Sequence, residues 1–173
     1  MGHEAHARRA DAVGMKLTIL ISLGLALLFA CTAKASATTT YHSATEQRTI
    51  VLLNQIRAKH GLHSLRLDGP LSRAAREHSG NLLNRGYFSH DGPDGTFNAR
   101  LNRYVKRNPV AENIAWGTGG FSTAAGIVSL WMASPEHRHI VLLPQLRRVG
   151  LGVAYGTFQS NAGAAMATAD FSS

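Results

Sequence analysis

The chain has 173 residues, of which 45% are hydrophobic and 16% charged, and it carries a formal net charge of +8. This length suffices for one domain with its own core, and the positive charge favours attraction to an anionic cell-wall or membrane surface. The arginines and lysines are scattered and match no nucleic-acid-binding module, so we expect no nucleic acid partner.

An apolar run at residues 17–30 dominates the N-terminal part of the chain. It follows three basic residues and precedes Ala33-Lys34-Ala35, an A-x-A pattern. This order is typical of a secretory signal peptide. We therefore expect residues 1–35 to be an N-terminal extension and signal peptide that is cut after Ala35, with translation starting at Met15 and the protein secreted. A membrane anchor is the alternative, but the run is shorter than the roughly 20 residues that a spanning helix needs.

Cys31 is the only cysteine in the chain. The residues before it faintly resemble a bacterial lipoprotein box, so a lipid anchor through Cys31 is an alternative to free secretion, although Phe29 is a poor residue for such a box. If Cys31 leaves with the signal peptide, the mature domain has no disulfide and depends on packing for its stability.

The polar residues 36–42 predict a linker to a single domain over residues 43–173. Ser43 and Glu46 have the spacing of a capping box, in which each side chain binds the backbone N–H of the other residue. The sequence therefore predicts a helix that begins at Ser43 and ends near Gly61.

A second helix is predicted after an extended connection and a turn at residues 68–70. Its apolar residues form one continuous stripe, and Gly86 ends it. The stripe consists of Leu71, Ala74, Ala75, His78, Leu82 and Leu83. We interpret His78 as a histidine at the edge of the core with a hydrogen bond, not as a ligand.

The periodic pattern breaks between residues 87 and 109. Gly, Pro and Asp residues predict a loop around His90, followed by a short helix at residues 97–101. A histidine on a loop, directly after an aromatic pair, is well placed for function.

The C-terminal half alternates strands and helices. Ser134 and Pro135 form the best helix-start signal, because serine caps the backbone and proline lacks the N–H that a first helical turn cannot use. His137 falls in that first turn, where a positive charge is disfavoured, so we expect it to be neutral. The predicted elements are strands at 110–116, 148–155 and 164–171, helices at 121–133 and 136–143, and a long connection at 156–163.

Six motifs in order along the chain resemble those of bacterial CAP-superfamily (SCP-like) domains. They are Leu53-Asn54-Gln55-Ile56-Arg57 with Gly61-Leu62-His63-Ser64-Leu65, Leu71-Ser72-Arg73-Ala74-Ala75-Arg76-Glu77-His78-Ser79, Phe88-Ser89-His90, Ala111-Glu112-Asn113-Ile114-Ala115, Trp131-Met132-Ala133-Ser134-Pro135-Glu136-His137-Arg138 and Val149-Gly150-Leu151-Gly152-Val153. The resemblance covers about residues 46–171. It implies an α+β fold, an α-β-α sandwich with a small three-stranded antiparallel sheet at its centre.

The resemblance also implies a cleft with two histidines and two glutamates. The first of each carries over to His90 and Glu112, and the bacterial Ser-Pro-x-His-Arg motif adds His137. The register of the second glutamate falls on Ser134. Glu136 stands where many bacterial members have glycine, so Ser134 and Glu136 are both candidates for a fourth position.

Two imidazoles and a carboxylate in one cleft suit two kinds of chemistry. His90, Glu112 and His137 are candidate ligands of a divalent metal such as zinc, with an open position for water or substrate. Alternatively, Glu112 orients a histidine that acts as a general base. Asn113 is a further cleft candidate, and it also suits a structural role, in which it ties down loop backbone through hydrogen bonds.

Three functions remain open from the sequence. The mature domain has no cysteine, and Ser89 lies in no nucleophile-elbow pattern. We therefore expect a secreted binding or interaction module for a lipid, glycan or peptide. The alternatives are a metal-dependent or water-activating, peptidase-like extracellular hydrolase, and a structural cell-wall-associated protein held by its charge.

Overall fold

The computed structural model describes residues 43–93, 95–106 and 109–173. The expected signal peptide, its membrane-anchor and lipoprotein alternatives, and the expected linker fall within residues 1–42, which lie outside the described residues. Within the described ranges, no helix has the length and apolar character needed to cross a membrane.

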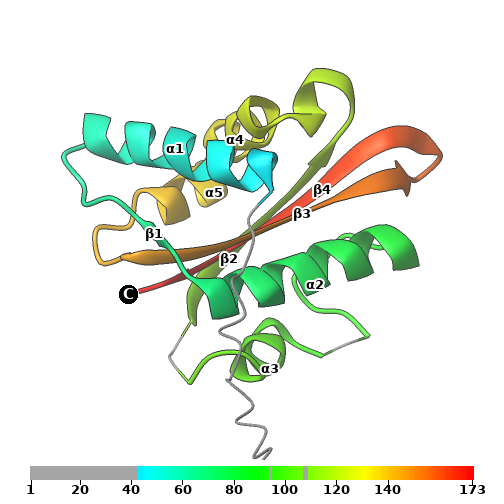
Figure 1. Ribbon diagram of the computed structural model, residues 1–173, viewed down its shortest axis with the longest axis horizontal. Helices are drawn as coiled ribbons and strands as arrows, with labels where there is room; N and C mark the ends of the chain where they lie inside the picture. The colour runs from blue at the N-terminus through cyan, green and yellow to red at the C-terminus, as the bar shows by residue number, and fades with distance from the viewer. Residues whose placement is uncertain (1–42, 94, 107–108) are drawn as a thin grey trace, which may run out of the picture. The chain divides into compact units, whose positions relative to one another are not determined.

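The described chain forms the α-β-α sandwich that the sequence predicts. Figure 1 shows α1, α4 and α5 on one side of a central sheet and α2 with α3 on the other. The elements are α1 (Ala44–Lys59), β1 (Arg66–Leu67), α2 (Gly69–Arg85), α3 (Phe97–Asn102), β2 (Pro109–Gly117), the 3-10 helix η1 (Gly119–Ser122), α4 (Ala124–Ala133), α5 (Pro135–Val141), β3 (Arg148–Phe158) and β4 (Asn161–Ser172).

The sheet has four strands in the order β1-β3-β4-β2, and not three. β4 pairs antiparallel with both β2 and β3, so the three expected strands form an antiparallel sheet, whereas β1 pairs parallel with the start of β3. β1 has only two residues, so no alternation of polar and apolar residues could reveal it. The edge strands are therefore β1 and β2, and β2 is the one that carries Glu112.

The prediction of a long connection at residues 156–163 is wrong. The strands continue to Phe158 and Asn161, and only Gln159 and Ser160 form the turn. Both turn residues have positive φ, 46° and 68°, as in the two-residue turns that match the twist of a hairpin. Gln-Ser lacks the usual Asn-Gly signature, and the surrounding glycines suggested a longer loop.

Three helix boundaries follow the capping residues. The Ser43 capping box is present, and Ser134 accepts a hydrogen bond from the backbone N–H of His137, with Pro135 in the first turn of α5. α4 begins later than expected, because Thr123 caps it by accepting from the backbone N–H of Gly126, 3.1 Å away. α5 ends at Val141 and not at residue 143.

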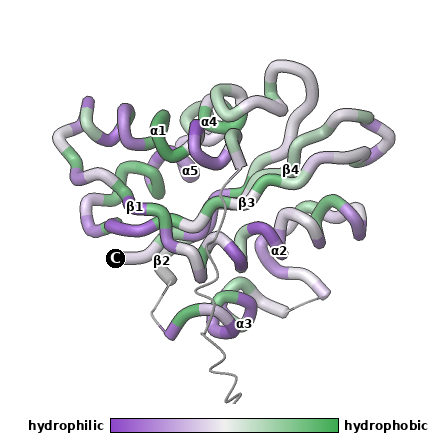
Figure 2. The backbone as a smooth tube through the Cα atoms, viewed as in Figure 1, coloured by the Kyte–Doolittle hydropathy of each residue, from purple (hydrophilic) through white to green (hydrophobic). Residues whose placement is uncertain are grey.

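The helix α2 packs with its backbone directly against the sheet. All six residues of its predicted stripe are buried, and β4, one of the strands that it contacts, is rich in alanine. The backbone coloured by hydropathy shows hydrophobic segments along the middle of β3 and β4 (Figure 2). A Cβ atom added at Gly152 would lie 2.3 Å from the backbone of Ala75, and one at Gly150 would lie 2.1 Å from that of Leu71. Only glycine permits this close approach.

We expect Gly152→Ala to lower the free energy of unfolding by about 1–3 kcal/mol or more, because the added methyl group has to push α2 off the sheet. Gly80→Ala is the matched control. Gly80 lies within α2 with open space around its Cβ direction, so the same change should stabilise the helix by about 0.5–1 kcal/mol. Chemical denaturation measures both values. Equal stabilities for Gly152→Ala and the parent would contradict the packing described.

Candidate functional site

Glu112 lies on β2 and is the centre of a network of charged side chains. Its carboxylate is almost completely buried, and its Oε1 is 2.8 Å from Nδ1 of His90, in the loop after α2. Oε1 is also 3.8 Å from Nε2 of the buried His78 on α2. The structure thus brings together two of the three residues that the sequence points to, His90 and Glu112.

Arg100 of α3 holds the other side of this carboxylate. Its side chain is completely buried and donates a hydrogen bond from Nη2 to Oε2 of Glu112. Nη1 of the same guanidinium donates to the backbone carbonyl of His90, 3.0 Å away. One buried arginine therefore fixes both the acid and the backbone of the histidine loop, and Thr96 caps the short helix that carries it.

Asp170 of β4 lies opposite Glu112 in the strand register, and its carboxyl group is completely buried. Among the described residues, no N–H or O–H group donates to either of its oxygens. Burial, together with the negative charge of Glu112, raises the pKa of Asp170 well above its ordinary value. A protonated Asp170 can then donate a hydrogen bond to the Glu112 carboxylate.

The network shifts the pKa values of Glu112 and His90 in opposite directions. Burial alone would raise the pKa of Glu112, but the hydrogen bond to His90 and the charge of Arg100 outweigh it, so this pKa lies below its ordinary value. The same hydrogen bond raises the pKa of His90. An ionised Glu112 therefore accepts from Nδ1–H of His90, and Nε2 is the ring nitrogen left for a ligand or for proton transfer.

His137 stands on the other side of β2, at the start of α5. Burial, the largest cause, and the charge of His90 lower the pKa of His137. Its imidazole therefore tends to be neutral, as the sequence predicts, but burial and not the helix start is the main reason. Asn113 donates from Nδ2 to the backbone carbonyl of His137, 3.0 Å away. Asn113 is itself completely buried, and this contact fits the structural role considered for it.

His137 also borders an apolar groove of about 250 Å³ between β2 and α4. Its rim includes Phe88, which is 43% exposed and lies two positions before His90 in the chain. Ser134 lines the groove, whereas Glu136 is exposed on α5 and lies outside it. The groove is lined by Phe88, Ile114, Ala115, Trp116, Leu130, Trp131, Ser134 and His137.

A metal centre does not fit these residues. The described parts of the chain contain no group of three or more His, Cys, Asp or Glu side chains placed to hold a metal ion. The oxygens of Glu112 are already bound by His90 and Arg100, and a guanidinium beside the carboxylate repels a cation. Glu112 thus orients His90 and does not present itself as a ligand.

The sequence did not point to Arg100 or Asp170 as members of the network, and it predicted His78 only as a residue at the edge of the core. Arg100 was hidden in a short helix with no strong pattern. Asp170 had a signal that was available, because it is an acid within an alanine-rich strand that was expected to be buried. His78 is buried as expected, and its Nε2 lies 3.1 Å from the backbone carbonyl of Ser89, which ties α2 to the histidine loop.

We expect the imidazole of His90 to titrate above the ordinary histidine pKa and that of His137 below it, because Glu112 stabilises one cation while burial disfavours the other. Since folding raises the pKa of His90, its contribution to stability is complete below the unfolded-state pKa and is lost as the pH rises through the folded-state pKa. NMR titration of the ring signals, assigned with His90→Gln and His137→Gln, measures both. Coincident titrations at the ordinary value would refute this arrangement.

Comparison with known proteins agrees with the fold. A family model described as CAP: Cysteine-rich secretory protein family matches residues 51–171. Two proteins of Bacillus subtilis (strain 168), YkwD and the membrane protein YlbC, are each 33% identical to the chain, over 112 and 110 residues respectively. These matches cover 64% and 62% of this chain, but only 42% of YkwD and 31% of YlbC.

Solved structures show the same architecture. An extracellular protein of Bacillus anthracis that contains an SCP domain is 28% identical, with a TM-score of 0.58; the match covers 72% of this chain and 39% of that one. An outer surface protein of Borrelia burgdorferi is 17% identical, with a TM-score of 0.57 and coverage of 76% and 97%, and it supports the fold alone. The chain belongs to the CAP family, the cysteine-rich secretory protein family.

Proposed function

We propose that this CAP domain is a secreted binding module whose apolar groove, beside His137, takes the apolar part of a ligand. The observation that carries the proposal is the groove itself. Apolar and aromatic side chains make up most of its lining, and Ser134 and His137 are the polar residues among the described ones that line it. Binding sites combine an apolar lining with a few polar groups that fix orientation.

The lining favours a lipid chain or an apolar peptide side chain over a glycan. A glycan presents many hydroxyl groups, and each would lose hydrogen bonds to water in a groove with two polar residues. Phe88 is exposed at the rim, so it can close over an apolar ligand without a change of fold. The ring nitrogen of a neutral His137 and the hydroxyl of Ser134 can each hydrogen-bond the polar end of that ligand.

Secretion is the second part of the proposal. It is supported by the apolar run and the A-x-A pattern within residues 1–35. It is also supported by the similarity to an extracellular protein of Bacillus anthracis.

A water-activating hydrolase is the second candidate, and one observation favours it. The pKa of His90 is raised and that of His137 is lowered, and paired groups with opposite shifts suit a general acid and a general base. The hydroxyl of Ser89, beside His90 in the chain, accepts from the backbone N–H of Asp91 at 3.3 Å. The Ser134 hydroxyl accepts the backbone N–H of His137 as a helix cap, so water would have to attack the substrate.

We expect the pure domain to bind dodecanoic acid or an apolar peptide, with a change in tryptophan fluorescence because Trp116 and Trp131 line the groove. Phe88→Ala should weaken binding about tenfold, as expected for the loss of one aromatic contact. Phe121→Ala is the matched control, since Phe121 is another exposed phenylalanine, 54% exposed and outside the groove. Absence of binding, or equal weakening by both variants, would contradict the binding module.

The same preparations separate the two candidates. Assays with peptide and ester substrates should show no turnover if the domain only binds. Turnover that His90→Ala abolishes, while Phe121→Ala retains it, would replace the binding module with the hydrolase.

A further inference from the structure

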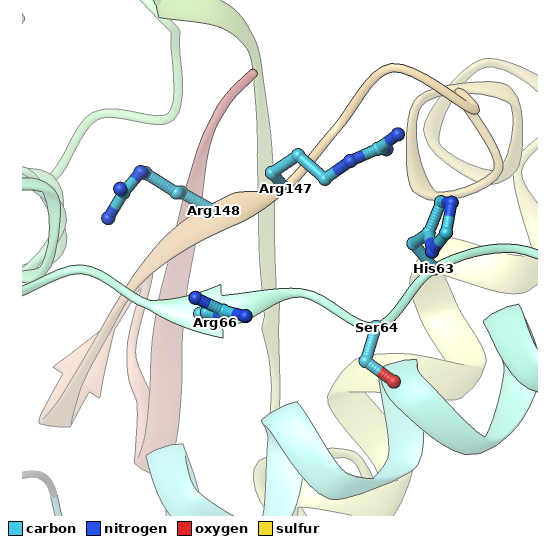
Figure 3. Close-up of a pocket in the computed structure, with 5 residues that line it drawn as sticks. All are labelled: His63, Ser64, Arg66, Arg147 and Arg148. Carbon is cyan, nitrogen blue, oxygen red and sulfur yellow. The ribbon is translucent and has the colours of Figure 1, made fainter.

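A second, basic pocket lies at the opposite edge of the sheet from Glu112. It has a volume of about 450 Å³ and opens between the α1–β1 connection and the start of β3. Figure 3 shows Arg147 extending towards the side of His63, Arg148 extending the other way, and Arg66 between them on β1. The pocket is lined by His63, Ser64, Arg66, Arg147 and Arg148.

Positive charge is concentrated in this pocket. Three of its five lining residues are arginines and none is acidic. Arg66 and Arg148 are direct partners in the parallel pairing of β1 with β3. Placing like charges opposite each other costs stability. Asp68 offsets the positive charge only in part. Its Oδ2 is 3.5 Å from Nη1 of Arg148, and Arg148 extends to the side of the pocket away from His63, so Asp68 compensates only that side.

A buried arginine beneath the pocket adds to the charge and holds both walls. Arg57 of α1 is completely buried, and its pKa is lowered by burial and by the nearby charge of Arg147. It donates from Nε to the carbonyl of His63 at 2.8 Å, and from Nη2 to that of Leu146 at 3.2 Å. Nη1 donates to the carbonyls of Val141 and Leu143. A single guanidinium thus fixes the backbone on either side of the opening.

The wall that carries His63 and Ser64 is held a second time. Asn54 of α1 donates to the carbonyl of Leu65 at 3.0 Å and accepts from its backbone N–H at 2.8 Å. The backbone of the pocket is therefore fixed before any ligand arrives, and Nη1 of Arg147 is held in place by the carbonyls of Pro144 and Leu146. Preorganisation of this kind reduces the entropic cost of binding.

We propose that this basic pocket binds a phosphate group carried by a small organic molecule or a lipid headgroup. Guanidinium groups match the geometry of phosphate oxygens, and the hydroxyl of Ser64 and the ring of His63 add donors from another direction. A tetrahedral anion can accept from several directions at once, whereas a planar carboxylate is satisfied by one arginine. The volume of the pocket leaves room for a substituent on the phosphate.

Calorimetric titration with inorganic phosphate and glycerol 3-phosphate, and sedimentation with phosphatidylglycerol vesicles against phosphatidylcholine vesicles, test this site. The double variant Arg66→Gln/Arg147→Gln should bind at least about tenfold more weakly than the parent, because it loses charge-assisted hydrogen bonds. The control Arg48→Gln/Arg85→Gln removes the same charge from exposed positions outside the pocket and should bind within about twofold of the parent. Thermal melts confirm that all variants fold.

If the parent binds the soluble phosphates, and only Arg66→Gln/Arg147→Gln weakens that binding, the ligand is a free phosphorylated molecule. Binding confined to phosphatidylglycerol vesicles, with the same variant dependence, would support a lipid headgroup. The proposal is overturned if none of the anionic probes binds, or if both double variants weaken binding equally, which would indicate attraction to net charge alone. Dodecanoic acid tests the apolar groove separately and carries no phosphate, so failure of the apolar groove and failure of this site are distinguishable.

Discussion

The buried carboxylate of Glu112 is the interaction on which the candidate site depends. It gathers His90 from a loop, Arg100 from α3 and Asp170 from the neighbouring strand. An isolated buried carboxylate would be strongly destabilising, and its cost is offset here by a guanidinium, an imidazole and a neutral acid. The hydrogen bond to Glu112 in turn raises the pKa of His90, and burial together with the charge of Glu112 raises the pKa of Asp170, so one ion shifts the titration of both neighbours.

The edge strand β2 uses two successive residues to organise two layers of the sandwich. Glu112 faces α2 and α3, while Asn113 binds the backbone of α5, because successive side chains of a strand point to opposite faces. The histidine loop and the start of α5 therefore meet over one strand, with the apolar groove beside them. At the opposite sheet edge, Arg57 has a comparable role, since it fixes two separate backbone segments through their carbonyl groups.

The sequence predicts those parts of the structure that depend on local patterns. The capping serines Ser43 and Ser134 and the apolar stripe of α2 are local, and the structure confirms them. His90 and Glu112 came from the family resemblance, and only the fold brings them together. Arg100 and the two-residue strand β1 could not be predicted in this way, because their roles come from tertiary contacts that leave no periodic signal. Asp170 did leave a signal, as an acid within an alanine-rich strand. The sequence also predicts a loop at Phe158, where the structure has the end of β3, because the Gln-Ser hairpin turn lacks the glycine that usually marks such a turn.

The most direct test of this network is a carbon-detected NMR titration of the carboxyl groups of Glu112 and Asp170, assigned with Glu112→Gln and Asp170→Asn. The structure predicts that Glu112 loses its proton below the ordinary glutamate pKa and that Asp170 retains its proton well above the ordinary aspartate pKa. Two carboxyl groups that titrate at ordinary values, or a Glu112 that stays protonated while Asp170 ionises, would contradict the arrangement from which the raised pKa of His90 follows.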